Sequence, residues 1–306
     1  MHLINRRTFL GSLGSGALAV GQEDTLFRSE TRLVQLYATV VNSKGELVTT
    51  LPQSAFKVYE NGLEQPIKLF KREDFPVSLG LVVDNSGSMR DRRQKVELAT
   101  LAMVKASNRL DQIFIVNFND EAFLDCDFTS SVKEMEERGL SRIDSRGGTA
   151  FFDALSMSVD HVKRGKRDKR VLMLITDGAD NASTNTLEKL IAKLHASEGI
   201  VVHAIGLLAT ETPRDAKKAK RAIQTITQAT GGLSFFPEEL AQVEKLALQV
   251  AHDIRNQYTI GYTPTNSTLD GTFRQVKVVA TGPNKPIVRT RSGYYAKQDE
   301  AKKSSL

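Results

Sequence analysis

The chain has 306 residues, of which 40% are hydrophobic and 25% charged, so it can bury a core and is not disordered as a whole. Its net charge of +6 comes from 42 basic and 36 acidic residues mixed along the sequence. This mixing argues against binding of nucleic acid, for which basic residues gather on one face. One cysteine and five scattered histidines exclude an internal disulfide and argue against a metal site built from these residues. Any metal binding or catalysis must therefore rely mainly on side chains that carry oxygen.

Residues 1–21 are predicted to be an export signal, because Arg6 and Arg7 precede a short apolar run that ends in small residues. Phe9 and Leu10 after the paired arginines resemble a twin-arginine signal, with an ordinary Sec signal as the alternative. The run is shorter than the roughly 20 apolar residues that span a bilayer, and it is compatible with cleavage or with a weak anchor. We expect no other membrane segment and a location in the periplasm, in the cell envelope or outside the cell.

Residues 31–74 have the pattern of β-strands. Apolar and polar residues alternate from Val34 to Val41, and the Asn61-Gly62 turn lies among the shorter apolar runs that follow. So few strands cannot close a core alone, and we expect the missing ones from the far end of the chain.

Residues 76–254 change to alternating strands and helices. The nearly continuous apolar run from Val77 to Asp84 predicts a strand covered on both faces, and apolar spacings of 3 and 4 from Val96 to Leu110 predict a helix. The further expected strands are 113–118, 121–128 at an edge, 171–176, 200–207 and 233–236, and the further expected helices lie near 149–163, 187–194, 215–229 and 237–254. This alternation predicts an α/β fold with a doubly wound, mostly parallel sheet, whose ligand sites lie beyond the carboxyl ends of the strands.

Residues 257–296 return to a strand pattern, with apolar runs bounded by glycines and prolines. We infer that they pair with residues 31–74 in a small β-rich domain that flanks the α/β domain. The alternative is two separate β segments packed on the α/β body. Residues 297–306 are polar and are expected to form a flexible tail.

Three oxygen-bearing motifs are predicted to meet at one edge of the sheet. Asp84, Ser86 and Ser88 follow the first buried strand, Thr149 opens a helix, and Asp177 follows another buried strand. Because the carboxyl ends of parallel strands lie at one edge, we expect these five side chains to gather there. Their oxygens suit a hard divalent cation such as Mg²⁺, with Mn²⁺ or Ca²⁺ as alternatives.

Five further residues flank this predicted metal site. Gly87, Gly148 and Gly178 allow tight loops, Asp153 suits the first turn of its helix, and Asp180 lies near the same edge. Taken singly, each motif also fits a helix cap or a turn.

At these residues the chain resembles the von Willebrand factor A family and its metal-ion-dependent adhesion site. The elements Asp84-x-Ser86-x-Ser88, Thr149 and Asp177 occur in the family's order, and the resemblance covers residues 76–254. It implies that the hydroxyls bind the metal directly, that the aspartates bind directly or through water, and that a partner's carboxylate takes the sixth position. The flanking segments, with Asn256–Pro264 after the last helix, look like VWFA-related domain proteins of acidobacterial type.

The leading hypothesis is an exported, non-enzymatic module that binds an Asp or Glu side chain of a protein partner through a divalent cation. Two carboxylates would leave a bound Mg²⁺ near neutral and still electrophilic, and the motifs offer no histidine, lysine or cysteine as base or nucleophile. One alternative is a scaffold of an envelope assembly with a structural metal, covered by the β-rich segments. A remote alternative is a hydrolase or phosphatase with Asp84 as nucleophile, although Ser86 stands where such phosphatases need a second aspartate.

Overall fold

The computed structural model describes residues 33–141 and 145–297. The predicted export signal and nearly all of the predicted tail lie outside the described residues. No helix within the described ranges combines the length and the apolar character that a bilayer crossing requires.

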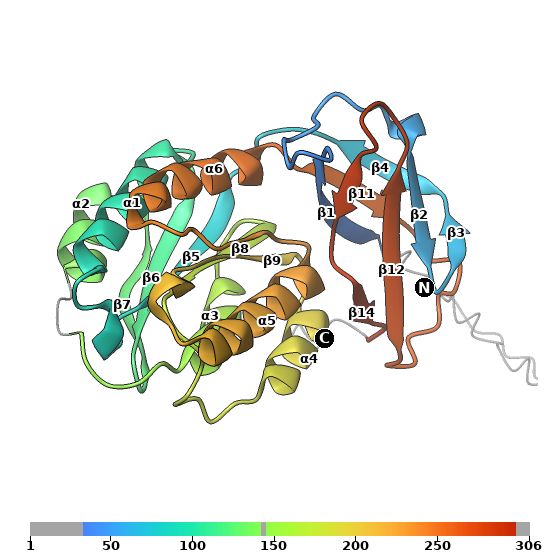
Figure 1. The fold of residues 1–306 in the computed structure, drawn as a ribbon. Coiled ribbons are helices and arrows are strands. Elements are labelled where there is room, and N and C mark those ends of the chain that lie inside the picture. The colour runs from blue at the N-terminus through green and yellow to red at the C-terminus, as the bar shows by residue number, and fades with distance from the viewer. Residues whose placement is uncertain (1–32, 142–144, 298–306) are drawn as a thin grey trace, which may run out of the picture. The chain divides into compact units, whose positions relative to one another are not determined.

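A six-stranded sheet forms the centre of the α/β part, and it is parallel except for one edge strand (Figure 1). Its strands, in spatial order, are β10 (Ser234–Phe235), β9 (Ile200–Gly206), β8 (Lys169–Thr176), β5 (Val77–Asp84), β6 (Gln112–Phe118) and the antiparallel β7 (Ala122–Thr129). Every residue of β5 is buried, as its continuous apolar run predicts for a central strand covered on both faces. The next strand in the chain, β6, lies on one side of β5, whereas the later strands β8, β9 and β10 lie on its other side. The strand order therefore reverses at β5, and ligands in such folds bind beyond the carboxyl ends of the strands at this point.

Helices cover both faces of this sheet (Figure 1). Apolar residues of two helices, α1 (Arg93–Ala106) and α6 (Val243–Arg255), share one core cluster with the sheet. Apolar residues of three others, α3 (Phe151–Val162), α4 (Leu187–Ala196) and α5 (Pro213–Thr230), share a second cluster on the other face. The doubly wound α/β fold class predicted from the sequence is therefore confirmed.

Two antiparallel sheets are built from the segments before and after the α/β part. The first contains β13 (Ile287–Arg289), β1 (Val34–Val41), β11 (Tyr258–Tyr262) and β4 (Ile67–Lys71). The second contains β14 (Gly293–Tyr295), β12 (Phe273–Ala280), β2 (Phe56–Glu60) and β3 (Leu63–Gln65). Their apolar side chains form a third core cluster, which confirms β-rich sheets drawn from both ends of the chain. The domain boundaries themselves stay a prediction.

Some helix boundaries differ from those predicted. α1 ends at Ala106, and Leu110, predicted to lie on its apolar face, is 61% exposed. The side chains of Asn108 and Asp111 accept backbone N–H groups here and close a turn in place of another helical turn. α6 begins at Val243, after the 3₁₀ turn η5 (Leu240–Gln242), because the preceding Glu239 is extended. The short helical segments α2 (Val132–Glu134) and η3 (Met135–Leu140) were not predicted.

Candidate metal centre

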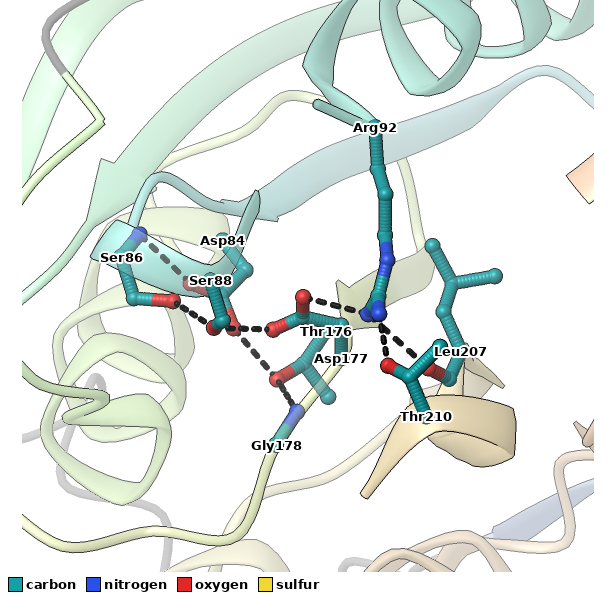
Figure 2. A network of polar contacts seen from close by, with 9 residues as sticks. All are labelled: Asp84, Ser86, Ser88, Arg92, Thr176, Asp177, Gly178, Leu207 and Thr210. Carbon is teal, nitrogen blue, oxygen red and sulfur yellow. Dashed lines mark hydrogen bonds and ion pairs between the residues drawn. The ribbon is translucent and has the colours of Figure 1, made fainter. Parts of the chain in front are cut away.

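Asp84 stands at the carboxyl end of β5, and both oxygens of its carboxylate accept hydrogen bonds (Figure 2). Its Oδ1 accepts the backbone N–H of Ser86 at 2.8 Å, and its Oδ2 accepts the hydroxyl of Thr176 at 2.6 Å. Thr176 ends β8, which pairs with β5, so the two strand ends hold this carboxylate together. The fully buried side chain thus has one fixed orientation.

The loop after Asp84 carries the two serine hydroxyls to the carboxylate of Asp177. Ser86 Oγ lies 3.1 Å from Ser88 Oγ, and Ser88 Oγ donates to Asp177 Oδ1 at 2.8 Å. Figure 2 shows these side chains facing one another beside Asp84. The structure therefore brings four of the five predicted ligands into one polar network.

Thr149, the fifth predicted ligand, lies beside the turn that follows Asp177. A Cβ built on Gly178 would lie 3.6 Å from Thr149 Oγ1, so its hydroxyl faces this turn closely. Asn181 holds the threonine in place, since its Oδ1 accepts the Thr149 N–H at 2.8 Å and its own N–H donates to Thr149 O at 3.0 Å. Helix α3 begins two residues later, at Phe151, so Thr149 itself is not the cap of that helix.

Glycines bring the loops of the site close together. The N–H of Gly87 donates to Gly147 O at 3.2 Å, which joins the serine loop to the threonine loop. Gly147 has φ +72°, and a Cβ there would lie 2.0 Å from Asp120 Oδ2, so a side chain would break this arrangement. Asp120, which sequence reasoning missed, accepts the N–H of Gly148 at 2.7 Å.

Exposure is unequal among the predicted ligands. Asp84 and Asp177 are fully buried, Ser86 is 1% exposed and Thr149 is 4% exposed, whereas Ser88 is exposed. Any group that reaches these oxygens from solvent would therefore approach over Ser88.

Arg92 is a further member of the network that sequence reasoning missed. Its Nη1 lies 2.6 Å from Asp177 Oδ2 and donates to Leu207 O at 3.3 Å, and its Nη2 donates to Thr210 Oγ1 (Figure 2). The charged run Arg90–Arg93 directly after the serine loop was the available signal. The expectation that two carboxylates alone balance a cation is incomplete, because Arg92 already neutralises one of them.

Burial makes both carboxylates expensive to ionise without a cation. It raises the pKa of Asp84 to about 6, although the Thr176 hydrogen bond lowers it, and the nearby charge of Asp177 raises it further. Burial also raises the pKa of Asp177 above its usual range, although Ser88 and Arg92 lower it. A bound cation would favour the ionised form of both groups.

Asp153 and Asp180 tie the loop after β8 to the start of α3. Asp180 Oδ2 accepts the Phe152 N–H at 2.9 Å, and the Asp153 carboxylate accepts the N–H groups of Thr184 and Asn185, each at 2.8 Å. Burial would raise the pKa of Asp153, but these hydrogen bonds hold it below its usual range. Both aspartates thus support the loops that carry Thr149 and Asp177.

The donor set fits a hard divalent cation. The five predicted metal ligands all offer carboxylate or hydroxyl oxygens, which suit Mg²⁺ and Mn²⁺ better than soft metals. In the described ranges, no three His, Cys, Asp or Glu side chains form a group that could hold a metal ion. A cation at this edge would therefore depend on hydroxyls as much as on carboxylates.

Comparisons with known proteins address the family of the α/β part. Residues 79–179 match the model of the von Willebrand factor type A domain. The family model and the fold together support a von Willebrand factor A domain in this chain. Inter-alpha-trypsin inhibitor heavy chain H4 of Sus scrofa is 31% identical over 115 residues, which cover 34% of this chain and 12% of that protein. The chain spans a third or less of the length of the curated relatives that it matches.

Two solved structures share the fold at low sequence identity. One is a von Willebrand factor type A protein from Catenulispora acidiphila, with a TM-score of 0.53 and 13% identity over 90% of this chain and 76% of that one. The other is proximal thread matrix protein 1 of the mussel byssus with a zinc-occupied MIDAS motif, with a TM-score of 0.51 and 18% identity over 62% of this chain and 48% of that one. Von Willebrand factor A domains are in general interaction modules that bind protein partners. The resemblance to acidobacterial proteins stays a prediction.

Proposed function

We propose that this protein is an exported, non-enzymatic interaction module that binds an acidic side chain of a protein partner through a divalent cation. Asp84, Ser86, Ser88, Thr149 and Asp177 would hold the cation, with Mg²⁺ as the first choice and Mn²⁺ or Ca²⁺ as alternatives. A bound cation would supply a Lewis-acidic position that an incoming carboxylate can occupy.

One observation carries the proposal: the hydroxyls of Ser86 and Ser88 and the carboxylate of Asp177 form a continuous row of oxygens, and the middle residue of this row, Ser88, is exposed. The zinc-occupied motif of the mussel protein supports a metal at this place in the fold. Asp84 is buried with both oxygens engaged, which suits a cation-facing carboxylate better than a nucleophile.

Metal titration tests the cation site. Mg²⁺ and Mn²⁺ should bind the wild-type chain with micromolar to millimolar affinity and raise its melting temperature as the metal concentration rises. Asp84→Ala should abolish both effects, whereas Asp91→Asn, a change at an exposed carboxylate in the same loop, should keep them. The proposal would be contradicted if neither metal changed the melting temperature of the wild-type chain.

Partner capture tests the interaction. Protein partners retained from a cell-envelope fraction in Mg²⁺ should be lost when EDTA is added, and Asp84→Ala should retain none of them. If partners are still retained in EDTA and by Asp84→Ala, their binding does not depend on the cation.

A structural metal is the second candidate, favoured by the burial of Thr149 at 4% exposure. In that case, metal removal would lower stability, while partner binding would persist in any protein that remained folded. Measurement of both quantities on the same samples separates the two functions.

Export is part of the proposal and has its own test. A twin-arginine signal at residues 1–21 should carry a fused reporter out of the cytoplasm, and Arg6→Lys with Arg7→Lys should retain it. A reporter that is exported equally well after both changes would favour the Sec route.

A further inference from the structure

Arg92 contacts Asp177 from the side that faces away from the serine hydroxyls. Its Nη1 lies 2.6 Å from Asp177 Oδ2, whereas Asp177 Oδ1 accepts the hydroxyl of Ser88 at 2.8 Å. Figure 2 shows Asp177 between the guanidinium group and the serines. The carboxylate therefore keeps one oxygen toward the proposed cation and has the other paired with a fixed positive charge.

The guanidinium group is anchored as well as paired. Leu207 O and Thr210 Oγ1, which follow β9, both accept its N–H groups, and the Arg92 side chain is only 14% exposed. The neighbouring Arg93, by contrast, donates to the backbone oxygen of Asp84 at 3.1 Å. The charge of Arg92 is thus held beside a predicted ligand carboxylate.

A fixed positive charge at this position has two opposite electrostatic effects. It repels a divalent cation and cancels part of the charge of Asp177, so the cation binds less tightly. It also leaves the charge of a bound cation less compensated, so an incoming anion is attracted more strongly.

We propose that Arg92 tunes this site by lowering its affinity for the divalent cation and raising the affinity of the loaded site for a carboxylate ligand. The inference rests on the proposed function, because it concerns the cation that Asp84 and Asp177 would bind. Arg92 acts here as a positioning residue through Asp177.

Two titrations of the full chain test this role. Calorimetry measures Mn²⁺ binding, and paramagnetic broadening of the acetate methyl signal then measures acetate binding to the Mn²⁺-loaded protein. Arg92→Gln should bind Mn²⁺ about tenfold more tightly than the wild type and acetate about threefold more weakly. A purely structural role would weaken both, because a distorted site holds neither ligand well.

Three further variants complete this test. Arg92→Lys keeps the positive charge and should stay within about threefold of the wild type for both ligands. Arg90→Gln removes a charge from an exposed residue of the same loop and should change neither affinity by more than about twofold. If circular dichroism shows that Arg92→Gln is unfolded, Arg92→Met is used in its place. The same changes in the affinities for Mn²⁺ and acetate are expected of it.

The outcomes distinguish the inference from the proposed function. A folded Arg92→Gln chain that binds Mn²⁺ no more tightly than the wild type overturns the inference alone. A lysine variant that shifts both affinities as the glutamine variant does also overturns it, since charge would not be the cause. A wild-type chain that does not bind Mn²⁺ overturns the proposed function as well.

Discussion

Asp84 combines burial with charge, and this combination is costly unless a cation is bound. The side chain is fully buried, and burial raises its pKa from the usual 3.8 to about 6. At neutral pH the residue is still mostly ionised, so the folded chain carries a desolvated carboxylate close to that of Asp177. Such an arrangement lowers stability in return for a binding site.

Asp84→Asn is therefore expected to stabilise the metal-free protein. The folded-state pKa lies above the unfolded value, so the cost of the ionised group is absent below about pH 3.8 and complete above about pH 6. In EDTA at pH 7 the variant should be more stable by about 2 kcal/mol, and this gain should shrink as the pH falls toward 4. Urea denaturation at several pH values measures the difference.

The exposed Asp91 provides the control for this prediction. Asp91→Asn should change stability by less than about 0.5 kcal/mol at any of these pH values. An Asp84→Asn chain less stable than the wild type at pH 7 would show that hydrogen bonding outweighs desolvation at this carboxylate.

Lys169, at the start of β8, is a second buried charge and lies outside the site. Its Nζ donates to Ile254 O at the end of α6 and lies 5.4 Å from the centre of the Tyr37 ring. Burial lowers its pKa from 10.5 to about 7, although Asp74 and Asp111 raise it. Folding therefore tends to release a proton from this group.

The pH dependence of stability should reveal this lysine. Between about pH 7 and 10.5 the unfolded chain holds more protons on Lys169 than the folded chain, so its contribution makes stability rise with pH. Lys169→Met should remove a slope of roughly 1 kcal/mol per pH unit between pH 7 and 10. Lys166→Met, a change at an exposed lysine nearby, should leave the slope unchanged in the same urea titrations.

At the scale of elements, the start of α3 and the loop after β8 behave as one supporting piece. The Asp153 carboxylate accepts bonds from Thr184 and Asn185, and this loop also carries Asn181, which holds Thr149. The position of the threonine thus depends on a contact made in the first turn of a helix.

Asp153→Ala is expected to loosen this piece. Loss of several hydrogen bonds to a carboxylate should destabilise the protein by about 2 kcal/mol and lower its affinity for Mn²⁺ severalfold. Asp160→Ala, on the same helix, removes an exposed ion pair with Lys193 and should cost less than about 1 kcal/mol. Denaturation and metal titration of both variants compare the two aspartates, and equal effects would contradict the supporting role.

At the scale of the whole molecule, the two antiparallel sheets depend on chain segments far apart in sequence. β11 lies between β1 and β4, and β12 pairs with β2. The buried Glu60 on β2 accepts the hydroxyls of Tyr262 on β11 and Tyr294 on β14, both at 2.7 Å, and so links the two sheets. Neither end of the chain can complete these sheets without the other.

A chain that ends at residue 256 tests this dependence. Without β11 and β12, residues 33–75 should lose their partners and become sensitive to protease, whereas residues 77–255 should remain resistant. Limited proteolysis with mass spectrometry, run beside the full chain, reports the cleavage sites. Equal resistance of residues 33–75 in both chains would show that this segment folds without its distant partners.

Local patterns in the sequence predicted most of the strands and helices, although not α2 and η3, and they predicted that the candidate site residues lie at one edge of the sheet. The buried run Val77–Asp84 predicted a central strand, and the position of Asp84, Thr149 and Asp177 beside strand ends or a helix start predicted one shared edge. Such predictions are possible because the spacing of apolar residues over a short segment indicates the element type, and the end of each parallel strand indicates the edge of the sheet at which it lies. The helix predicted from Val96 to Leu110 extends too far, because α1 ends at Ala106. Side-chain hydrogen bonds of Asn108 and Asp111 to backbone N–H groups close a turn there and compete with a further helical turn.

The electrostatics of the site, in contrast, arise from contacts between residues that are distant in the chain. Arg92 and Asp177 are 85 residues apart, and Thr176 and Asp84 are 92 apart, yet each pair lies within hydrogen-bond distance. No spacing rule in the sequence predicts them, because they depend on which strands are neighbours and on how the loops beyond those strands pack. The residue types came from the sequence, but the charge that balances Asp177 is set by the folded arrangement of the chain.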